Sequence, residues 1–270
     1  MSVASTGVSE IALALLTTMS SPPKCAAAVS IAVFTAASSR TSTQSGSARP
    51  PAAAISAAAV WMVPGSFGCG VSLFAAIAAA VDRFGGIDIL INNASAISLT
   101  GTLETTMKRF DLMHQINTRG TFVVSKWAIP YLEKAANPHI LMLSPPLDMQ
   151  EKWFARHTAY TMAKFGMSLV VLGLAGELRA KGIAVNALWP RTAIDTEAIR
   201  LIAGQDARKK TRRPEIVADA AYWIVTQPSR KVTGRFFLDD EVLRSAGITD
   251  FSRYLHEGVT ERDLMGDFFL

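Results

Sequence analysis

Short apolar runs alternate with longer helix-like stretches from Asp82 to the end of the sequence. Four of the runs have the length and the bounding residues of buried strands, and they span residues 87–91, 139–144, 183–189 and 234–238. Helices are predicted over residues 103–135 and 157–180, and a third is predicted to open at Pro214 and end near residue 226. Strands that alternate with helices predict an α/β fold, a doubly wound parallel sheet of the Rossmann-like kind.

The helix predicted over residues 157–180 carries two reactive side chains, Tyr160 and Lys164. Their spacing of four places them on one helical face. A nearby positive charge favours phenolate, so Lys164 is expected to lower the pKa of Tyr160. A phenol tuned in this way can give a proton to a carbonyl or take one from an alcohol. The Tyr-x-x-x-Lys spacing is common in helices, and its meaning depends on the motifs around it.

Two of the predicted strands end in polar residues. Ser144 closes the run 139–144, and Asn93 and Ala94 follow the run 87–91. Open α/β sheets bind ligands at the carboxyl ends of their strands, so the Ser144 hydroxyl is expected at that edge. The residues after the run 87–91 either line a crevice there or form an ordinary turn.

Asn117 lies inside the helix predicted over residues 103–135. An asparagine is unfavourable in a helix interior. Its side chain therefore either bonds a backbone group and kinks the helix, or it is exposed to solvent.

The chain has 270 residues, of which 50% are hydrophobic and 18% are charged, and its net charge is +5. This length and composition suit one domain with a large core. The basic run from Arg208 to Arg213 has no interleaved aromatic residues, which favours a solvated loop or a flap near a substrate over a nucleic-acid partner. Cys25 and Cys69 define neither a disulfide framework nor a metal site.

The apolar residues 11–18 are the nearest match to a signal peptide. They form a short run, lack a preceding basic region and follow Glu10, so we do not interpret them as a signal. No run is expected to cross a membrane. We therefore expect a cytoplasmic protein with no membrane partner.

The first 77 residues differ in composition from residues 78–270. Residues 1–81 hold only four charged side chains, which are Glu10, Lys24, Arg40 and Arg49, and they are rich in Ala, Ser, Thr and Pro. No clear strand–turn–helix order can be read in them. We expect this segment to be poorly ordered and to form no recognisable N-terminal strands or glycine-rich cofactor loop.

An antisense origin explains this composition. If the segment is read from the complementary DNA strand, each residue type maps onto few others; Gly and Pro exchange, Thr and Val exchange, and Ala returns Ala. Read backwards from Ile77 under this rule, the segment includes FGGLDMVVNNASAISLT, which nearly repeats residues 84–100 of the same chain. We hypothesise that residues 1–77 are an antisense reading of a homologous stretch. A divergent Ala-rich segment is the alternative, and it leaves the match unexplained.

Gly65-x-x-Gly68-x-Gly70 resembles a loop that cradles phosphate. Its spacing is one residue short of the Gly-x-x-x-Gly-x-Gly loop that binds dinucleotides, and no clear strand is predicted before it. Under the antisense rule these glycines correspond to three prolines. We therefore do not interpret the motif as a phosphate site.

The motifs of residues 82–270 together resemble the short-chain dehydrogenase/reductase family. The motifs are Asn92-Asn93-Ala94-Ser95, Asn117, Ser144, Tyr160-x-x-x-Lys164 and Pro190-Arg191-Thr192. The phrases at residues 143–146, 187–192 and 267–270 are similar to the hydroxysteroid-dehydrogenase-like branch of that family.

The resemblance implies a role for each matching residue. It implies that Tyr160 is the general acid and base, that Lys164 lowers its pKa and bonds the nicotinamide ribose, and that Ser144 orients the substrate oxygen. Asn117 would hold a water of a proton relay. The residues that the resemblance places along the cofactor are Asn93, Ala94, Tyr160, Lys164, Pro190 and Thr192; it implies no metal.

The implied chemistry is reversible hydride transfer between NAD or NADP and a small carbonyl or alcohol substrate. The alternative is a catalytically dead remnant, because the family's first strands and glycine loop should precede Asp82. Without a first strand, the strand at residues 87–91 is expected to expose an edge. The resemblance also implies a homodimer or a homotetramer. His157 is interpreted as a capping or packing residue, and Trp153 and Phe154 as a wall of the cleft or as core.

Overall fold

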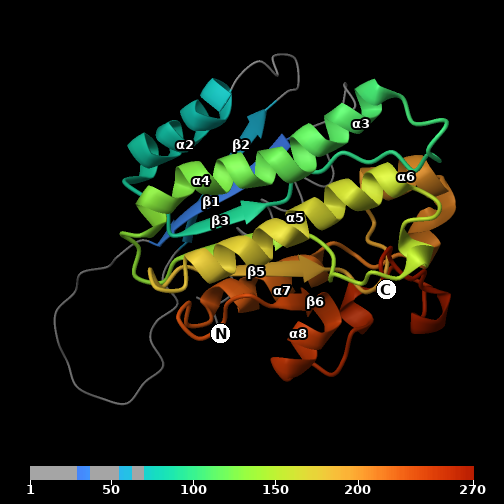
Figure 1. Ribbon diagram of the computed structural model, residues 1–270. Coiled ribbons are helices and arrows are strands. Elements are labelled where there is room, and N and C mark those ends of the chain that lie inside the picture. Colours follow the sequence, from blue (N-terminus) through green and yellow to red (C-terminus); the bar gives the residue numbers. More distant parts are fainter. Residues whose placement is uncertain (1–28, 37–54, 63–69) are drawn as a thin grey trace.

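The computed structural model describes residues 29–36, 55–62 and 70–270. Within these residues a six-stranded sheet lies between helices on both faces (Figure 1). The strands are β1 (Val29–Ala36), β2 (Ile55–Met62), β3 (Ile89–Asn92), β4 (His139–Leu143), β5 (Ala184–Trp189) and β6 (Phe236–Leu238). The last four correspond to the four strands predicted from the apolar runs, shifted at their ends by one or two residues.

The strand order is β2-β1-β3-β4-β5-β6. β3, β4, β5 and β6 pair in parallel, whereas β1 is antiparallel to both of its neighbours. Every residue of β3, β4 and β5 is buried. Strands covered on both faces need apolar residues at every position, which explains why these runs show no polar alternation. The α/β doubly wound prediction is confirmed.

The helices follow the strands in the predicted alternation. They are α2 (Gly70–Phe84), α3 (Met107–His114), α4 (Thr121–Leu132), α5 (Thr158–Glu177), α6 (Glu197–Ala203), α7 (Glu215–Thr226) and α8 (Asp239–Ser245). A π-helical turn, Gln115–Gly120, joins α3 to α4. Short 3-10 turns lie at Glu151–Trp153, Gln205–Lys210, Ser252–Tyr254 and Glu261–Asp263. Pro214 caps α7, as predicted.

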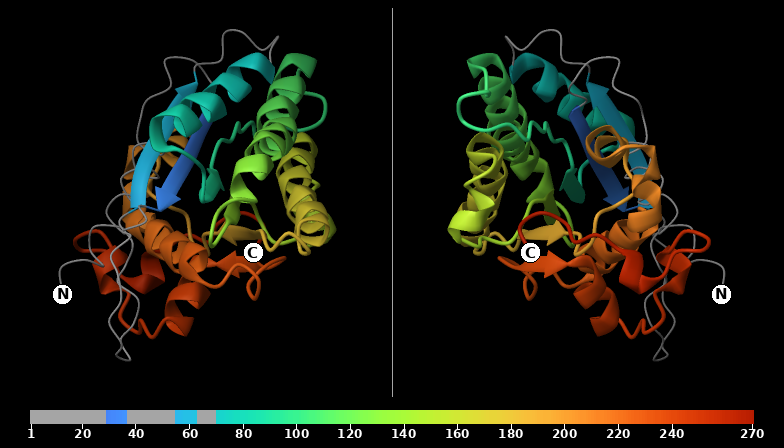
Figure 2. Two further views of the ribbon diagram at one scale, coloured as in Figure 1. Left: turned by 90° about the vertical axis from the view of Figure 1, so that its left-hand side faces the viewer. Right: turned by 90° about the vertical axis from the view of Figure 1, so that its right-hand side faces the viewer.

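Helices cover both faces of the sheet (Figure 2), and the core has two halves, one on each face. Leu90 and Ile140 point to the face covered by α2, α4 and α5. Their chain neighbours Ile91 and Leu141 point to the face covered by α7 and α8. Successive strand residues alternate between faces, so each buried strand contributes to both halves.

The expectation that β3 exposes an edge is wrong. β1 pairs with β3 over the register Ile31↔Asn92 to Phe34↔Ile89. β1 runs antiparallel there, whereas a doubly wound fold has a parallel strand at that position. An unpaired row of backbone N–H and C=O groups can be satisfied by an extended strand of either direction.

A strand precedes the glycine motif, contrary to the sequence prediction. β2 ends at Met62, and it runs in the same direction as β3 because both are antiparallel to β1. Gly70 is the first residue of α2, while Gly65 and Gly68 lie outside the described residues.

One described helix, α5, has the length and the apolar composition of a membrane span. This corrects the prediction that no run has those properties. More than half of the window is buried within the fold, where α5 packs on β4 and β5. Burial in the core accounts for the apolar composition of this helix.

Candidate active site

Tyr160 and Lys164 lie on the buried face of α5. Tyr160 is 4% exposed and Lys164 is 2% exposed. The Lys164 ammonium donates a hydrogen bond to the backbone oxygen of Leu143 at 2.7 Å, and it lies 4.8 Å from the centre of the Trp189 ring. Lys164 therefore faces the carboxyl ends of β4 and β5, where Leu143 and Trp189 are the last residues, and Tyr160 lies one turn before it on the same helical face.

Ser144 follows β4 directly and is fully buried. Its Oγ has no hydrogen-bond partner among the described residues. Leaving a buried hydroxyl unpaired costs about 1–3 kcal/mol, so such groups are uncommon and call for an explanation. The Lys164 ammonium bonds the carbonyl of the preceding residue, Leu143, and the Ser144 hydroxyl is left free to bond a ligand.

Burial is the largest influence on the pKa values of Tyr160 and Lys164. It lowers the pKa of Lys164 to about 7, against an opposing effect of the Asp267 carboxylate. Burial, with a smaller contribution from Asp267, raises the pKa of Tyr160 above its ordinary value. The expectation that the pKa of Tyr160 is lowered is therefore wrong, because burial disfavours the phenolate.

Asn117 lies in the π turn and is fully buried. Its Nδ2 donates to the Ala96 oxygen at 3.0 Å, and its Oδ1 accepts from the Ala96 nitrogen at 2.7 Å. Of the two alternatives, the backbone-bonding one is confirmed. The amide that is unfavourable in a regular helix here coincides with a wider turn, and π turns of this kind are frequent at functional sites.

The bonds from Asn117 hold the loop that follows β3. Asn93 and Ala94 begin this loop and are partly buried. Asn92 precedes them, and its Nδ2 donates to Ser125 Oγ on α4 at 3.1 Å. The loop is thus tied to the helical layer on both sides of the two residues predicted to contact cofactor.

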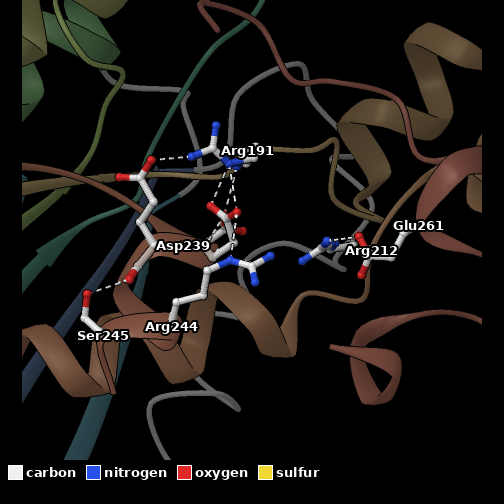
Figure 3. A network of polar contacts seen from close by, with 8 residues as sticks. Arg191, Arg212, Asp239, Arg244, Ser245 and Glu261 are labelled. Atoms are coloured by element: carbon white, nitrogen blue, oxygen red, sulfur yellow. Dashed lines mark hydrogen bonds and ion pairs between the residues drawn. The ribbon is translucent and has the colours of Figure 1, made fainter. Parts of the chain in front are cut away.

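The turn Pro190-Arg191-Thr192 follows β5 and is anchored to the start of α8 (Figure 3). The Arg191 nitrogen donates to Asp239 Oδ1 at 2.9 Å, and its Nε donates to both carboxylate oxygens of Asp240 at 2.8 Å. Burial raises the pKa of Asp239 to about 6. Thr192 Oγ1 is buried and, within the described residues, has no hydrogen-bond partner. This turn presents a second free hydroxyl at the same edge of the sheet as Ser144.

His157 packs against the dyad and caps nothing with its side chain. Its ring lies 5.9 Å from the Tyr160 ring, edge to face, and its Nδ1 pairs with Thr161 Oγ1 at 3.0 Å. Burial lowers its pKa. The packing interpretation of His157 is confirmed. Trp153 and Phe154 also join this half of the core, from its partly buried rim.

Residues near the end of the sequence complete the site, and sequence reasoning used them only for the family resemblance. The rings of Phe268 and Phe269 lie 6.5 and 6.1 Å from the Tyr160 ring. Trp189 Nε1 donates to the Phe268 oxygen at 2.8 Å. Burial raises the pKa of Asp267, which precedes them, to about 7. An adjacent Phe pair outside any periodic pattern gives no signal of a contact made across the whole fold.

The described residues fit the nicotinamide half of a dinucleotide. The orphaned hydroxyls of Ser144 and Thr192 supply partners for a carbonyl or a carboxamide, and Lys164 supplies a cation close by. In the described part of the chain, no group of three or more His, Cys, Asp and Glu side chains is placed to hold a metal ion.

Comparison with known proteins gives the class. A family model described as Enoyl-(Acyl carrier protein) reductase matches residues 32–241. The chain is 55% identical over 195 residues to Hydroxysteroid dehydrogenase-like protein 2 of Danio rerio, which covers 72% of this chain and 46% of that protein. The chain thus spans just under half the length of the curated relatives it matches.

Comparison with solved structures also finds dehydrogenases. One from Xanthomonas campestris is 56% identical with a TM-score of 0.70, and covers 73% of this chain and 72% of that one. A short-chain dehydrogenase from Mycobacterium thermoresistibile is 47% identical with a TM-score of 0.70, and covers 76% and 72%. The chain belongs to the short-chain dehydrogenase/reductase family, in its hydroxysteroid-dehydrogenase-like branch. By family it is an oxidoreductase.

Proposed function

We propose that this chain catalyses reversible hydride transfer between NAD or NADP and a small carbonyl or alcohol substrate. The observation that carries the proposal is the orphaned Ser144 hydroxyl, which is buried directly after Leu143, the residue whose oxygen accepts from Lys164. The cofactor supplies or accepts the hydride when bound. The chain's own residues then have to bind the substrate oxygen and move one proton.

Each of the three residues has a task that its surroundings support. The Ser144 hydroxyl donates to the substrate oxygen, which satisfies its own unmet hydrogen bond. Tyr160 keeps its proton in this buried site, so during carbonyl reduction it can give that proton to the same oxygen. In alcohol oxidation Tyr160 must take a proton as a phenolate, a form that a charged Lys164 favours and that burial disfavours.

Activity assays on wild type and Tyr160→Phe test the proposal. With NADH or NADPH and a panel of small ketones, wild type should turn over and the variant should lose about 10²–10⁴-fold in kcat, the usual contribution of a positioned acid. Cofactor affinity should change little, since the ring remains. Equal turnover by the two proteins would contradict the assignment of Tyr160.

One observation favours the alternative of a catalytically dead remnant. β1 lies antiparallel beside β3, so its carboxyl end at Ala36 lies beside the amino end of β3, at the opposite ends of the strands from Ser144. A dinucleotide-binding sheet places its phosphate loop at the same edge as the catalytic residues. A chain that binds neither NADH nor NADPH while remaining folded would support the remnant.

We also propose that a second copy of the chain covers the outer faces of α4 and α5. Phe122 is 49% exposed, Leu169 is 59% exposed and Leu172 is 48% exposed. Exposed apolar side chains clustered on neighbouring helices are typical of a protein interface. Light scattering of purified protein should give the mass of a dimer or a tetramer, and a monomer at micromolar concentration would contradict this.

A further inference from the structure

A short segment packs across the dyad from far away in the sequence. We name residues 266–269 the aromatic strap. An antiparallel bridge joins Gly266 to Thr192, and the Asp267 nitrogen donates to the Arg191 oxygen at 3.1 Å. The strap therefore rests on the turn after β5, which α8 holds in place through Arg191 (Figure 3).

Phe269 is the part of the strap that lies on the catalytic residues. Its ring is 1% exposed, and its centre lies 6.1 Å from that of Tyr160 with 30° between the planes. It lies 5.9 Å from the Trp189 ring, whose centre is 4.8 Å from the Lys164 ammonium. Phe269 therefore packs beside Tyr160 and beside the tryptophan that contacts Lys164.

The site is closed in this arrangement. Ser144 is fully buried and Lys164 and Tyr160 are nearly so, yet the Ser144 and Thr192 hydroxyls have no partner within the described chain. A substrate carbonyl cannot reach these hydroxyls until a covering group moves. The two unpaired hydroxyls are thus shielded from solvent, and the Phe269 ring packs on Tyr160 of the dyad.

The strap carries signs that it can be displaced. Phe269 has φ = 73°, the only positive φ of a non-glycine residue in the described chain. A side chain with a Cβ rarely adopts this conformation, and such strain clusters at ligand clamps and switches. Met265, which precedes the strap, is 37% exposed. Release of the strap would relieve the strain at Phe269.

We propose that the aromatic strap is an internal occupant of the substrate site, in which Phe269 takes the place beside Tyr160 where an apolar ring of the substrate binds. This rests on the proposed function and adds a substrate class, a ketone or aldehyde attached to a flat apolar ring. Such a substrate must compete with Phe269. The aromatic surroundings of Phe269, which include His157, Trp153 and Phe165, then contact the substrate ring in the same way.

The first test compares Phe269→Ala with Leu270→Ala, using acetophenone as a phenyl ketone probe. Phe269→Ala removes the competitor, and the space that it leaves is lined by apolar side chains that accept a phenyl ring. Its dissociation constant for acetophenone, measured by calorimetry without cofactor, should fall at least five-fold. Leu270→Ala removes an exposed neighbour and should leave the constant unchanged. An unchanged or weakened affinity of a folded Phe269→Ala variant would overturn the proposal.

The second test locks the strap without removing Phe269. Thr192 and Gly266 are paired residues of an antiparallel bridge, whose Cα spacing of about 4.5–5.5 Å a disulfide can span. A Cβ added at Gly266 clashes with nothing and lies more than 4 Å from the Thr192 side chain, so closing the disulfide draws the two residues slightly together. The variant is Thr192→Cys with Gly266→Cys, and Cys25 and Cys69 are replaced by serine. Its oxidised form should bind acetophenone at least ten-fold more weakly than its reduced form. Because both forms lack Thr192, that loss cancels in the comparison.

The binding readout separates this proposal from the proposed function. A difference between oxidised and reduced forms with no turnover in either supports the strap and contradicts the oxidoreductase. Turnover with equal binding by the two forms contradicts the strap alone. Absence of acetophenone binding in both forms and in Phe269→Ala overturns the ring subsite.

Discussion

Two buried serines, one directly after β4 and one on α5, differ in whether their hydroxyls have hydrogen-bond partners. Ser144 and Ser168 are both fully buried. Ser168 Oγ donates to the Pro145 oxygen at 2.6 Å, whereas Ser144 Oγ has no partner in the described chain. An unpaired buried hydroxyl costs free energy that a methyl group at the same place does not.

Ser144→Ala should therefore keep or raise the free energy of unfolding, by up to about 1 kcal/mol, and lower kcat/KM by about 10²–10³-fold through loss of the donor to the substrate oxygen. Urea unfolding and steady-state kinetics measure the two effects. The matched control, Ser168→Ala, should lose about 1–3 kcal/mol of stability because it leaves the Pro145 carbonyl unpaired. A Ser144→Ala variant that is as unstable as the control would contradict the orphan assignment.

Lys164 makes stability depend on pH in a definite direction. Its pKa is lowered to about 7 in the folded chain from an ordinary value of 10.5, because it is buried. Between these values the unfolded chain holds the proton that the folded chain has lost. The unfolded state then binds more protons, so the free energy of unfolding rises with pH, by at most about 1.4 kcal/mol per pH unit from this residue.

The measurement is denaturant unfolding of wild type and Lys164→Met at several values between pH 7.5 and 9.5. Wild type should gain stability across this window relative to the variant, which has no group to titrate there. Parallel pH profiles for the two proteins would show that Lys164 keeps its proton in the folded chain.

At the scale of elements, the π turn between α3 and α4 owes its shape to one amide. Asn117→Ala removes both hydrogen bonds to Ala96 and leaves that residue's N–H and C=O buried without a partner. We expect a loss of about 2–3 kcal/mol in the free energy of unfolding. Gln115→Ala, an exposed change in the same turn, should stay within about 0.5 kcal/mol of wild type. Equal stabilities of the two variants would contradict the anchoring role of Asn117.

The elements that sequence reasoning predicted well are those with a local signal. β3, β4 and β5 are recognisable as apolar runs, because strands that are buried on both faces consist almost entirely of apolar residues. The side chain of Asn117 could be narrowed to two alternatives, a bond to the backbone or exposure to solvent. The choice could not be made because its partner, Ala96, lies in a distant loop. The contact between Phe269 and Tyr160 is of the same long-range kind, and no periodicity marks it.

At the scale of the whole molecule, the part that was not predicted is the pairing of β1. Val29–Ala36 lies in a segment with almost no charge and many alanines, where apolar periodicity does not separate strand from other structure. Its place in the sheet follows from the free edge of β3, which is a property of the rest of the fold. The antisense origin of residues 1–77 stays a prediction about the gene.

Val33→Pro tests this pairing. Val33 lies opposite Leu90 in β3 and Ala58 in β2, and proline cannot donate to a ladder at such a central position. We expect a loss of about 3 kcal/mol, comparable to proline in other regular structure, or aggregation through the freed edge of β3. Urea unfolding with light scattering measures both. An unchanged protein would mean that β1 contributes nothing to the sheet.

The central claim is that this chain holds a nicotinamide cofactor beside Ser144, Tyr160 and Lys164. Titration of the purified protein with NADH and with NADPH, followed by nicotinamide fluorescence, tests it most directly. Wild type should saturate with a Kd below about 1 mM, in the range of working enzymes, and Lys164→Met should bind more weakly. A folded wild-type protein that saturates with neither cofactor would contradict the claim and leave a short-chain dehydrogenase fold without its chemistry.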